Sequence, residues 1–81
     1  MRGTVKLFAI LREMAGQSEM DWELDEGATV EMLVAHLQKT LPGLNNWNGR
    51  FWIAVNYSYT AMETSLQDGD EVALFPPVSG G

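Results

Sequence analysis

Cysteine is absent from this chain of 81 residues, and histidine occurs only once, as His36. Without cysteine the chain has no disulfide, no thiol nucleophile and no cysteine-ligated zinc or iron–sulfur centre. We interpret His36 as a surface or packing residue, because a general base also needs an orienting partner and a substrate pocket. A domain of this size buries only about 60–65% of the surface of its unfolded chain, so its core is small.

Basic residues are also scarce, with 5 lysines and arginines against 11 acidic residues and a net charge of −6. The basic side chains are scattered singly, whereas binding to nucleic acid or to an anionic membrane needs clustered positive charge. No apolar run approaches the roughly 20 residues of a membrane span, and the first residues do not resemble a signal peptide. We therefore expect a cytoplasmic protein with no nucleic-acid partner and no membrane partner.

Hydrophobic periodicity predicts one main helix and several strands. Apolar residues recur at helical spacing from Val30 to Leu41, with Thr29 as the N-cap and Pro42 after the end. Alternating patterns predict strands over 5–10, 19–24, 51–55 and 71–75, and a short strand is allowed between 56 and 63. A helical turn over 11–15 ends at Gly16. Residues 45–50 are expected to be a polar, turn-rich connection.

This order of elements predicts an α+β domain with the β-grasp arrangement. A single main helix has to cover one face of a mixed sheet of four to five strands, because no other element is available to bury that face. We assign residues 1–75 to this domain and residues 76–81 to a flexible, extended C-terminal tail that ends in two glycines.

The internal sequence offers little chemistry for an independent enzyme. Asp68, Asp70 and Glu71 could be read as part of a calcium loop, but they fit a hairpin turn much better. The serines have no histidine–aspartate partnership, and the glycines form no phosphate-binding loop. We expect no bound cofactor and no metal, and we expect that the chain is not an enzyme on its own.

The C-terminal segment has a different character, because no side chain from Val72 to Gly81 is charged. Pro76 and Pro77 stiffen the base of the tail, and the six residues after Phe75 can extend over about 20 Å. Gly80 and Gly81 have no side chains, so the tip can pass through a narrow tunnel and deliver a terminal carboxylate to a partner's active site. The alternative is a tail that is simply disordered.

Three aromatic residues, Phe8, Phe75 and Tyr59, are candidates for the uncovered face of the sheet. Aromatic side chains commonly anchor protein interfaces, so we predict a docking patch that continues into the tail. Phe8 and Phe75 could instead fill a second small cluster within the domain. The predicted docking residues of the tail are Pro76, Pro77, Val78 and Ser79.

The segment 66–81, which reads Leu-Gln-Asp-Gly-Asp-Glu-Val-Ala-Leu-Phe-Pro-Pro-Val-Ser-Gly-Gly, closely resembles the C-terminus of the MoaD family. These proteins are ubiquitin-like sulfur carriers and form the small subunit of molybdopterin synthase. The opening Val-Lys-Leu-Phe-Ala at 5–9 and Ala-Val-Asn at 54–56 are similar to the family as well, and the resemblance covers essentially the whole chain. Tyr59 stands where the family has an aliphatic residue.

The resemblance implies that an E1-like enzyme joins AMP to the carboxylate of Gly81, and that sulfur then displaces AMP to leave a thiocarboxylate. The tail would insert into the large catalytic subunit, where the sulfur goes to a cyclic pyranopterin precursor. The implied assembly is a heterotetramer with two large subunits at its centre. With no cysteine, a persulfide on a side chain is excluded, so Gly81 is the place for the sulfur.

Three other functions are consistent with the same residues. A sulfur carrier for thiamin thiazole synthesis would use the same chemistry, although the Phe75-Pro76-Pro77 segment disfavours it. A ubiquitin-like modifier would be joined to lysines through Gly81. A plain binding module would not need Gly80 and Gly81 at all.

Overall fold

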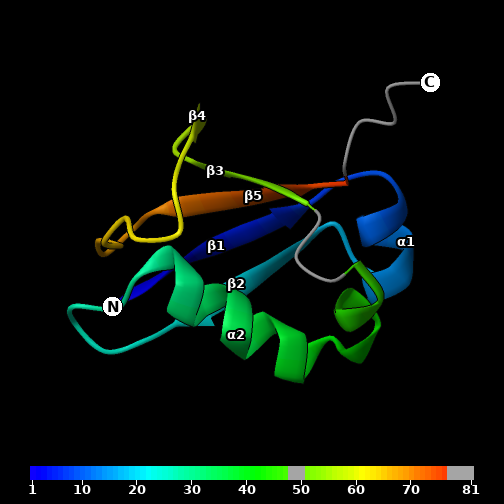
Figure 1. Ribbon diagram of the computed structural model, residues 1–81, viewed down its shortest axis with the longest axis horizontal. Helices are drawn as coiled ribbons and strands as arrows, with labels where there is room; N and C mark the ends of the chain where they lie inside the picture. Colours follow the sequence, from blue (N-terminus) through cyan, green and yellow to red (C-terminus); the bar gives the residue numbers. More distant parts are fainter. Residues whose placement is uncertain (48–50, 77–81) are drawn as a thin grey trace.

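The computed structural model describes residues 1–47 and 51–76, and this part of the chain contains five strands and two α-helices (Figure 1). A short 3₁₀ helix (η1) follows the second α-helix. The elements in chain order are β1 Arg2–Leu7, α1 Ile10–Ala15, β2 Glu19–Glu23, α2 Val30–Thr40, η1 Pro42–Trp47, β3 Trp52–Val55, β4 Ser58–Tyr59 and β5 Glu71–Phe75. No helix in the described residues is long and apolar enough to cross a membrane.

The five strands form one mixed sheet in the order β2-β1-β5-β3-β4. β1 and β2 pair as an antiparallel hairpin, and β3 pairs in antiparallel fashion with both β4 and β5. β1 and β5 are parallel, with Val5 opposite Val72 and Leu7 opposite Leu74. The last strand therefore lies in the middle of the sheet, and this is the β-grasp arrangement that the sequence predicts.

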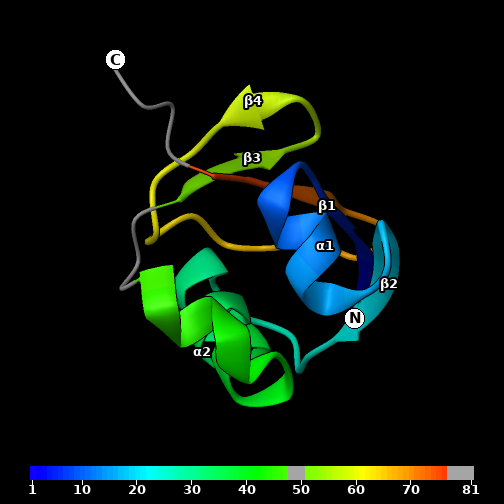
Figure 2. The same ribbon diagram turned by 90° about the vertical axis from the view of Figure 1, so that its right-hand side faces the viewer.

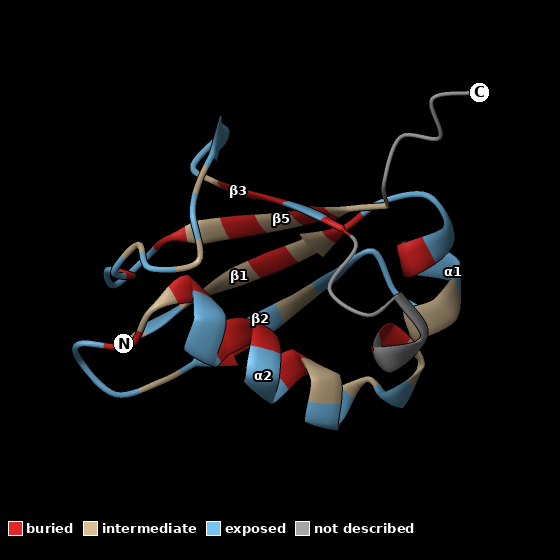
Figure 3. Cartoon of the chain, in the orientation of Figure 1, coloured by how far each residue is buried: buried red, intermediate tan, exposed pale blue. Residues whose placement is uncertain are grey.

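The helix α2 covers one face of this sheet and supplies much of the core (Figures 1 and 3). The Thr29 side chain accepts a hydrogen bond from the backbone N–H of Met32 at 3.4 Å, which confirms the predicted N-cap. The predicted apolar stripe is also confirmed, since it faces the sheet and is buried, apart from the partly buried Leu41 at its end. The buried members are Val30, Leu33, Val34 and Leu37.

Alternate residues of the two central strands point into the core beneath α2. Val5, Leu7, Val72 and Leu74 are almost completely buried, as the period of two requires for one covered face. Trp22 of β2 closes the core at the sheet edge, and its indole N–H donates to the backbone carbonyl of Asp70 at 3.0 Å. This bond satisfies the one polar group that the buried indole carries.

Two expectations about the connections need correction. The first strand ends at Leu7 rather than at residue 10, because Ala9 has a φ of 54° and Ile10 already begins α1. Gly16 ends α1 with a φ of 76°, as predicted. The connection after α2 is not simply irregular, since η1 covers Pro42–Trp47 and places Leu44 in the core. Residues 48–50, which include the predicted Asn48-Gly49 turn, lie outside the described residues.

The other face of the sheet carries no helix in the described part of the chain. Figure 2 shows α2 on one side of the sheet, with α1 near the end where β1 finishes. The outward residues of β1, β5 and β3 therefore stand on an open surface. That surface holds the candidate functional site.

Candidate functional site

Four aromatic side chains form a continuous row across the open face of the sheet. Phe8 stacks on Phe75 with ring centroids 4.6 Å apart and an interplanar angle of 9°. Tyr59 meets Phe75 edge-on at 6.3 Å, and Trp52 meets Tyr59 edge-on at 5.8 Å. Both geometries are favourable for aromatic pairs. We call these four residues the aromatic row.

The sheet register explains why the row assembles. Phe75 of β5 lies directly opposite Trp52 of β3, and Phe8 follows the end of the parallel neighbour β1. Phe8 remains 39% exposed and Trp52 remains 53% exposed. Large aromatic surface left open to solvent at one end of a sheet is typical of a protein interface.

A small groove lies beside the aromatic row, with a volume of about 220 Å³. Its floor is made by Ala54 and Ala73, which are opposite each other in the β3–β5 ladder. Because both side chains are only methyl groups, the surface is hollow here, and the larger aromatic side chains rise around it. Tyr57, at the tip of the β3–β4 hairpin, contributes to the wall of the groove.

The charged part of the groove wall is an ion pair between neighbouring strands. The Nζ of Lys6 lies 3.3 Å from a carboxylate oxygen of Glu71. This carboxylate accepts a hydrogen bond from Lys6 and attracts its charge, and both effects raise the pKa of Lys6 above its usual 10.5. Lys6 is therefore a cation at neutral pH, and its charge is matched at the groove by Glu71.

The hairpin tip is fixed by a network of hydrogen bonds around Asn56. Its backbone N–H donates to the Glu71 carbonyl at 2.8 Å, and its side-chain oxygen accepts from the Glu71 N–H at 3.0 Å. Its side-chain NH₂ donates to Asp70 at 2.9 Å, and Asp70 also accepts from the Gln67 N–H at 2.8 Å. The start of β5 and the β3–β4 turn are thus held together as one unit.

The chain leaves the sheet next to the aromatic row. β5 ends at Phe75, and Pro76, which follows it, is partly buried. The remaining predicted tail residues, Pro77, Val78, Ser79, Gly80 and Gly81, lie outside the described residues. The aromatic row and the groove therefore stand at the base of the predicted tail.

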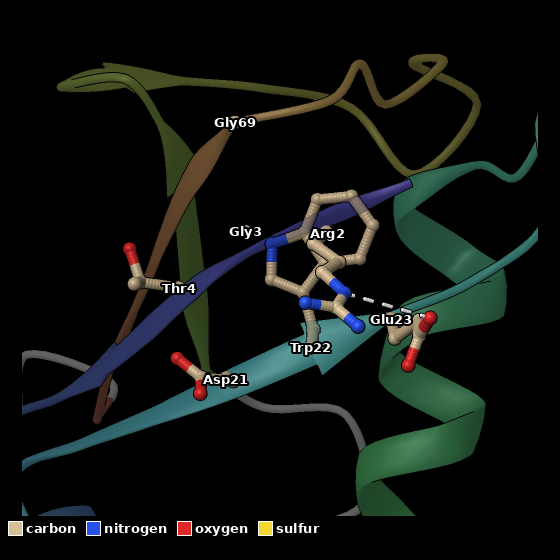
Figure 4. Close-up of a pocket in the computed structure, with 7 residues that line it drawn as sticks. All are labelled: Arg2, Gly3, Thr4, Asp21, Trp22, Glu23 and Gly69. Carbon is tan, nitrogen blue, oxygen red and sulfur yellow. Dashed lines mark ion pairs between the residues drawn. The ribbon is translucent and has the colours of Figure 1, made fainter.

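A larger hollow, of about 630 Å³, lies at the opposite end of the sheet (Figure 4). Arg2 and Glu23 form an exposed ion pair at 3.6 Å on its rim, and Asp21 and Thr4 line its side. Because β1 and β5 are parallel, the start of β1 is at the end of the sheet far from Phe75. Four of the seven residues that line this hollow have charged or polar side chains, and it lies far from the end of β5, so we do not assign the site to it.

The sequence analysis predicted part of this site. Phe8, Phe75 and Tyr59 do lie together on the open face, while their role in docking stays a prediction. Trp52 was missed, although it alternates outward from Phe51 and Ile53 and could have been found by that pattern. Tyr57 was missed because it lies in a turn, where hydrophobic periodicity does not predict on which face of the sheet a side chain lies.

The fold and this site together define a ubiquitin-like β-grasp protein with an open aromatic face at the base of its C-terminal segment. The chain belongs to the ThiS family, whose model matches residues 5–81. The molybdopterin synthase sulfur carrier subunit of Chlamydomonas reinhardtii is 40% identical over 83 residues, and the match covers 100% of both chains. The predicted resemblance to such carriers is confirmed.

Two solved structures have a similar fold over the full length of the chain. SAMP1 from Haloferax volcanii is 32% identical, with a TM-score of 0.89 and complete coverage of both chains. A chain of the complex of subunits 1 and 2 of molybdopterin-converting factor from Helicobacter pylori is 30% identical, with a TM-score of 0.74 and complete coverage of both chains. These similarities confirm the predicted β-grasp fold.

Proposed function

We propose that this protein is the sulfur carrier subunit of molybdopterin synthase and donates the sulfur without being an enzyme on its own. The observation that carries the proposal is that the central strand β5 leads directly into the C-terminal segment. This segment has no charged side chain and ends in two glycines. β5 holds the base of this segment rigidly, and the aromatic row beside Phe75 offers a surface for the receiving protein. The full-length similarity to a molybdopterin synthase sulfur carrier supports the same reading.

The chemistry takes place at the carboxylate of Gly81. A free carboxylate is a poor electrophile, so its oxygen first attacks the α-phosphorus of ATP, forming an acyl-adenylate and releasing pyrophosphate. A sulfur nucleophile at the oxidation level of sulfide, HS⁻, then attacks the carbonyl carbon, and the bond to AMP breaks as AMP leaves. The resulting thiocarboxylate is ionised at neutral pH, and its sulfur is the nucleophile that bonds to a cyclic pyranopterin precursor. Water then cleaves the bond between this sulfur and the Gly81 carbonyl carbon, which leaves the sulfur on the precursor and restores the carboxylate.

Two protein partners follow from this chemistry. An E1-like enzyme catalyses the adenylation, and the large catalytic subunit receives the tail that carries the thiocarboxylate. For the complete synthase we propose a heterotetramer in which two large subunits each hold one copy of this chain at the outside. Support for the second partner comes from the similar chain in a complex of two converting-factor subunits. We propose that these steps take place in the cytoplasm, where disulfides are rare, in keeping with a sequence that has no cysteine.

Mass spectrometry of the C-terminus tests the proposed function. When the protein is incubated with its activating enzyme, ATP and a sulfur source, we expect its mass to rise by the difference between one sulfur and one oxygen. Fragmentation should place the change on Gly81. An unmodified Gly81, under conditions in which a known carrier is converted, would contradict the proposal.

The Phe8→Ala substitution tests the docking role of the aromatic row. Phe8 is exposed and stacked on Phe75, so its ring is available to a partner without being needed for the core. Interface anchors of this kind typically contribute about 2 kcal/mol, and we expect about 30-fold weaker binding to the large subunit. Calorimetric titration measures the affinity.

Met32→Ala is the matched control for this measurement. Met32 is 56% exposed, and it lies on α2, which packs on the covered side of the sheet. Its loss removes a comparable apolar side chain without touching the aromatic row, so binding should be unchanged. Equal losses of affinity in the two variants would show that the open face is not the docking surface.

A second candidate function is conjugation to other proteins through Gly81. It is favoured by the close structural similarity to SAMP1 and by a 33% identity, over 95% of this chain, to small archaeal modifier protein 3 of Haloferax volcanii. Isopeptide-linked peptides carrying the two glycines, found in digested cell extract, would support this function. A carrier for thiamin thiazole synthesis would instead co-purify with a thiazole synthase.

A further inference from the structure

Tyr57 occupies a backbone conformation that tyrosine rarely adopts. The β3–β4 hairpin has a two-residue turn, in which Asn56 has a φ of 50° and Tyr57 has a φ of 70°. A turn with two positive φ angles favours asparagine first and glycine second. Asn56 fits this preference, whereas the Cβ of Tyr57 makes the left-handed conformation unfavourable.

The strain at Tyr57 is sustained by its neighbours. Asn56 makes hydrogen bonds to Glu71, the first residue of β5, and to Asp70 just before it, and these bonds hold the turn in one geometry. A strained residue persists when the surrounding structure over-determines its conformation, and such residues cluster at functional sites. The conformation of Tyr57 therefore calls for an explanation beyond the turn itself.

Burial within the domain does not explain the position of Tyr57. Its side chain is 87% exposed, so it contributes almost nothing to the core. It nevertheless lines the groove above Ala54 and Ala73, together with Phe8 and Tyr59. Tyrosine on a fixed turn offers a large contact area with little conformational entropy to lose on binding.

The size of the groove limits what can occupy it. Its volume of about 220 Å³ is below the range of roughly 300–1,000 Å³ that is usual for small-molecule pockets. It suits a single apolar side chain, the kind of anchor that fills a pocket at the centre of a protein interface. The two alanines and the aromatic walls offer such a side chain an apolar surface.

The position of the groove limits which protein supplies that side chain. Phe75 belongs to the groove wall, and Pro76 follows it directly. Only five residues separate Pro76 from the carboxylate of Gly81, a reach of about 17 Å at full extension. A protein that encloses the reacting end of the tail therefore comes within reach of the groove.

We propose that Tyr57 is an anchor residue for the large subunit of molybdopterin synthase, and that an apolar side chain of that subunit fills the groove between Tyr57 and Phe8. This inference rests on the proposed function, because it takes the large subunit as the protein that holds the tail. The strained conformation of Tyr57 holds its ring in the position in which the partner binds it, so little conformational entropy is lost on binding.

Two substitutions separate the ring of Tyr57 from the strain of its backbone. Tyr57→Gly removes both, whereas Tyr57→Ala removes the ring and keeps the strain. We expect both variants to bind the large subunit at least 10-fold more weakly than the wild type. We expect the melting temperature to rise by about 2–5 °C in Tyr57→Gly only. Tyr57→Phe keeps the ring and should retain nearly full affinity.

Each outcome of these measurements has a defined meaning. If the wild type does not bind the large subunit, both the proposed function and this inference fail. If the wild type binds and the glycine and alanine variants bind equally well, only the inference fails. Thiocarboxylate formation by the activating enzyme should stay unchanged in all variants. A loss confined to that reaction would assign Tyr57 to the activating enzyme and overturn the inference.

Discussion

Adding one residue after Gly81 is expected to abolish sulfur transfer and to leave the melting temperature of the domain unchanged. The added residue moves the terminal carboxylate away from the point at which the partner's catalytic groups act, and a misplacement of about 1 Å can already cost 100-fold in rate. None of the residues that form the described core belongs to the tail. Molybdopterin formed in a reconstituted reaction measures transfer, and circular dichroism measures stability.

Gly81→Trp should have the same effect by a different route. The tip of the tail has no side chains, so a bulky residue blocks passage through a narrow tunnel. Ala35→Trp is the matched control, because Ala35 is exposed on α2, and the same bulk there should not affect transfer. If the tail variants instead lowered the melting temperature sharply, the tail would be a structural element, and the carrier function would have to be abandoned.

Gly3→Ala is expected to destabilise the domain by about 3 kcal/mol, because there is no space for a Cβ atom at Gly3. A Cβ there would overlap the carbonyl oxygen of Asp70 and the indole of Trp22, with Trp22 Cε2 only 2.6 Å away. Relief of the overlap separates the indole N–H from its buried acceptor on Asp70. The melting temperature should fall by about 15 °C or more in a thermal denaturation experiment.

Gly27→Ala is the control that separates the cost of steric overlap at Gly3 from the cost of replacing a glycine. Gly27 has a φ of 89° and no atom near the position of a Cβ, so alanine there meets only the backbone penalty of about 1 kcal/mol. The Gly3 variant should therefore lose clearly more stability than the Gly27 variant. Similar losses would mean that the close contact between β1, Trp22 and Asp70 relaxes without cost.

The strands, the main helix and much of the candidate site could be predicted from hydrophobic periodicity. Val72 and Leu74 alternate with Ala73 and Phe75, so one pair had to face the core and the other the open side. The stripe of α2 was equally clear. A period of two also places Phe8 on the face of Phe75, once β1 and β5 are known to pair in parallel.

The turns and the connection after α2 could not be predicted, for different physical reasons. η1 has no distinctive period, and its burial of Leu44 depends on packing against distant elements. Tyr57 violates the local preference of its own turn, and the hydrogen bonds of Asn56 to residues 14 and 15 positions later hold it there. Local propensity fails where tertiary contacts override it.

The parallel pairing of β1 with β5 also bears on the order in which the molecule forms. The first strand finds its central neighbour only after residues 71–75 have been synthesised, so the sheet cannot close around a shorter chain. Contacts this distant in sequence form late and make folding slower than in helical domains. A chain cut short before β5 also lacks Gly81, so the closed sheet and the carboxylate that accepts sulfur arise together in the same completed molecule.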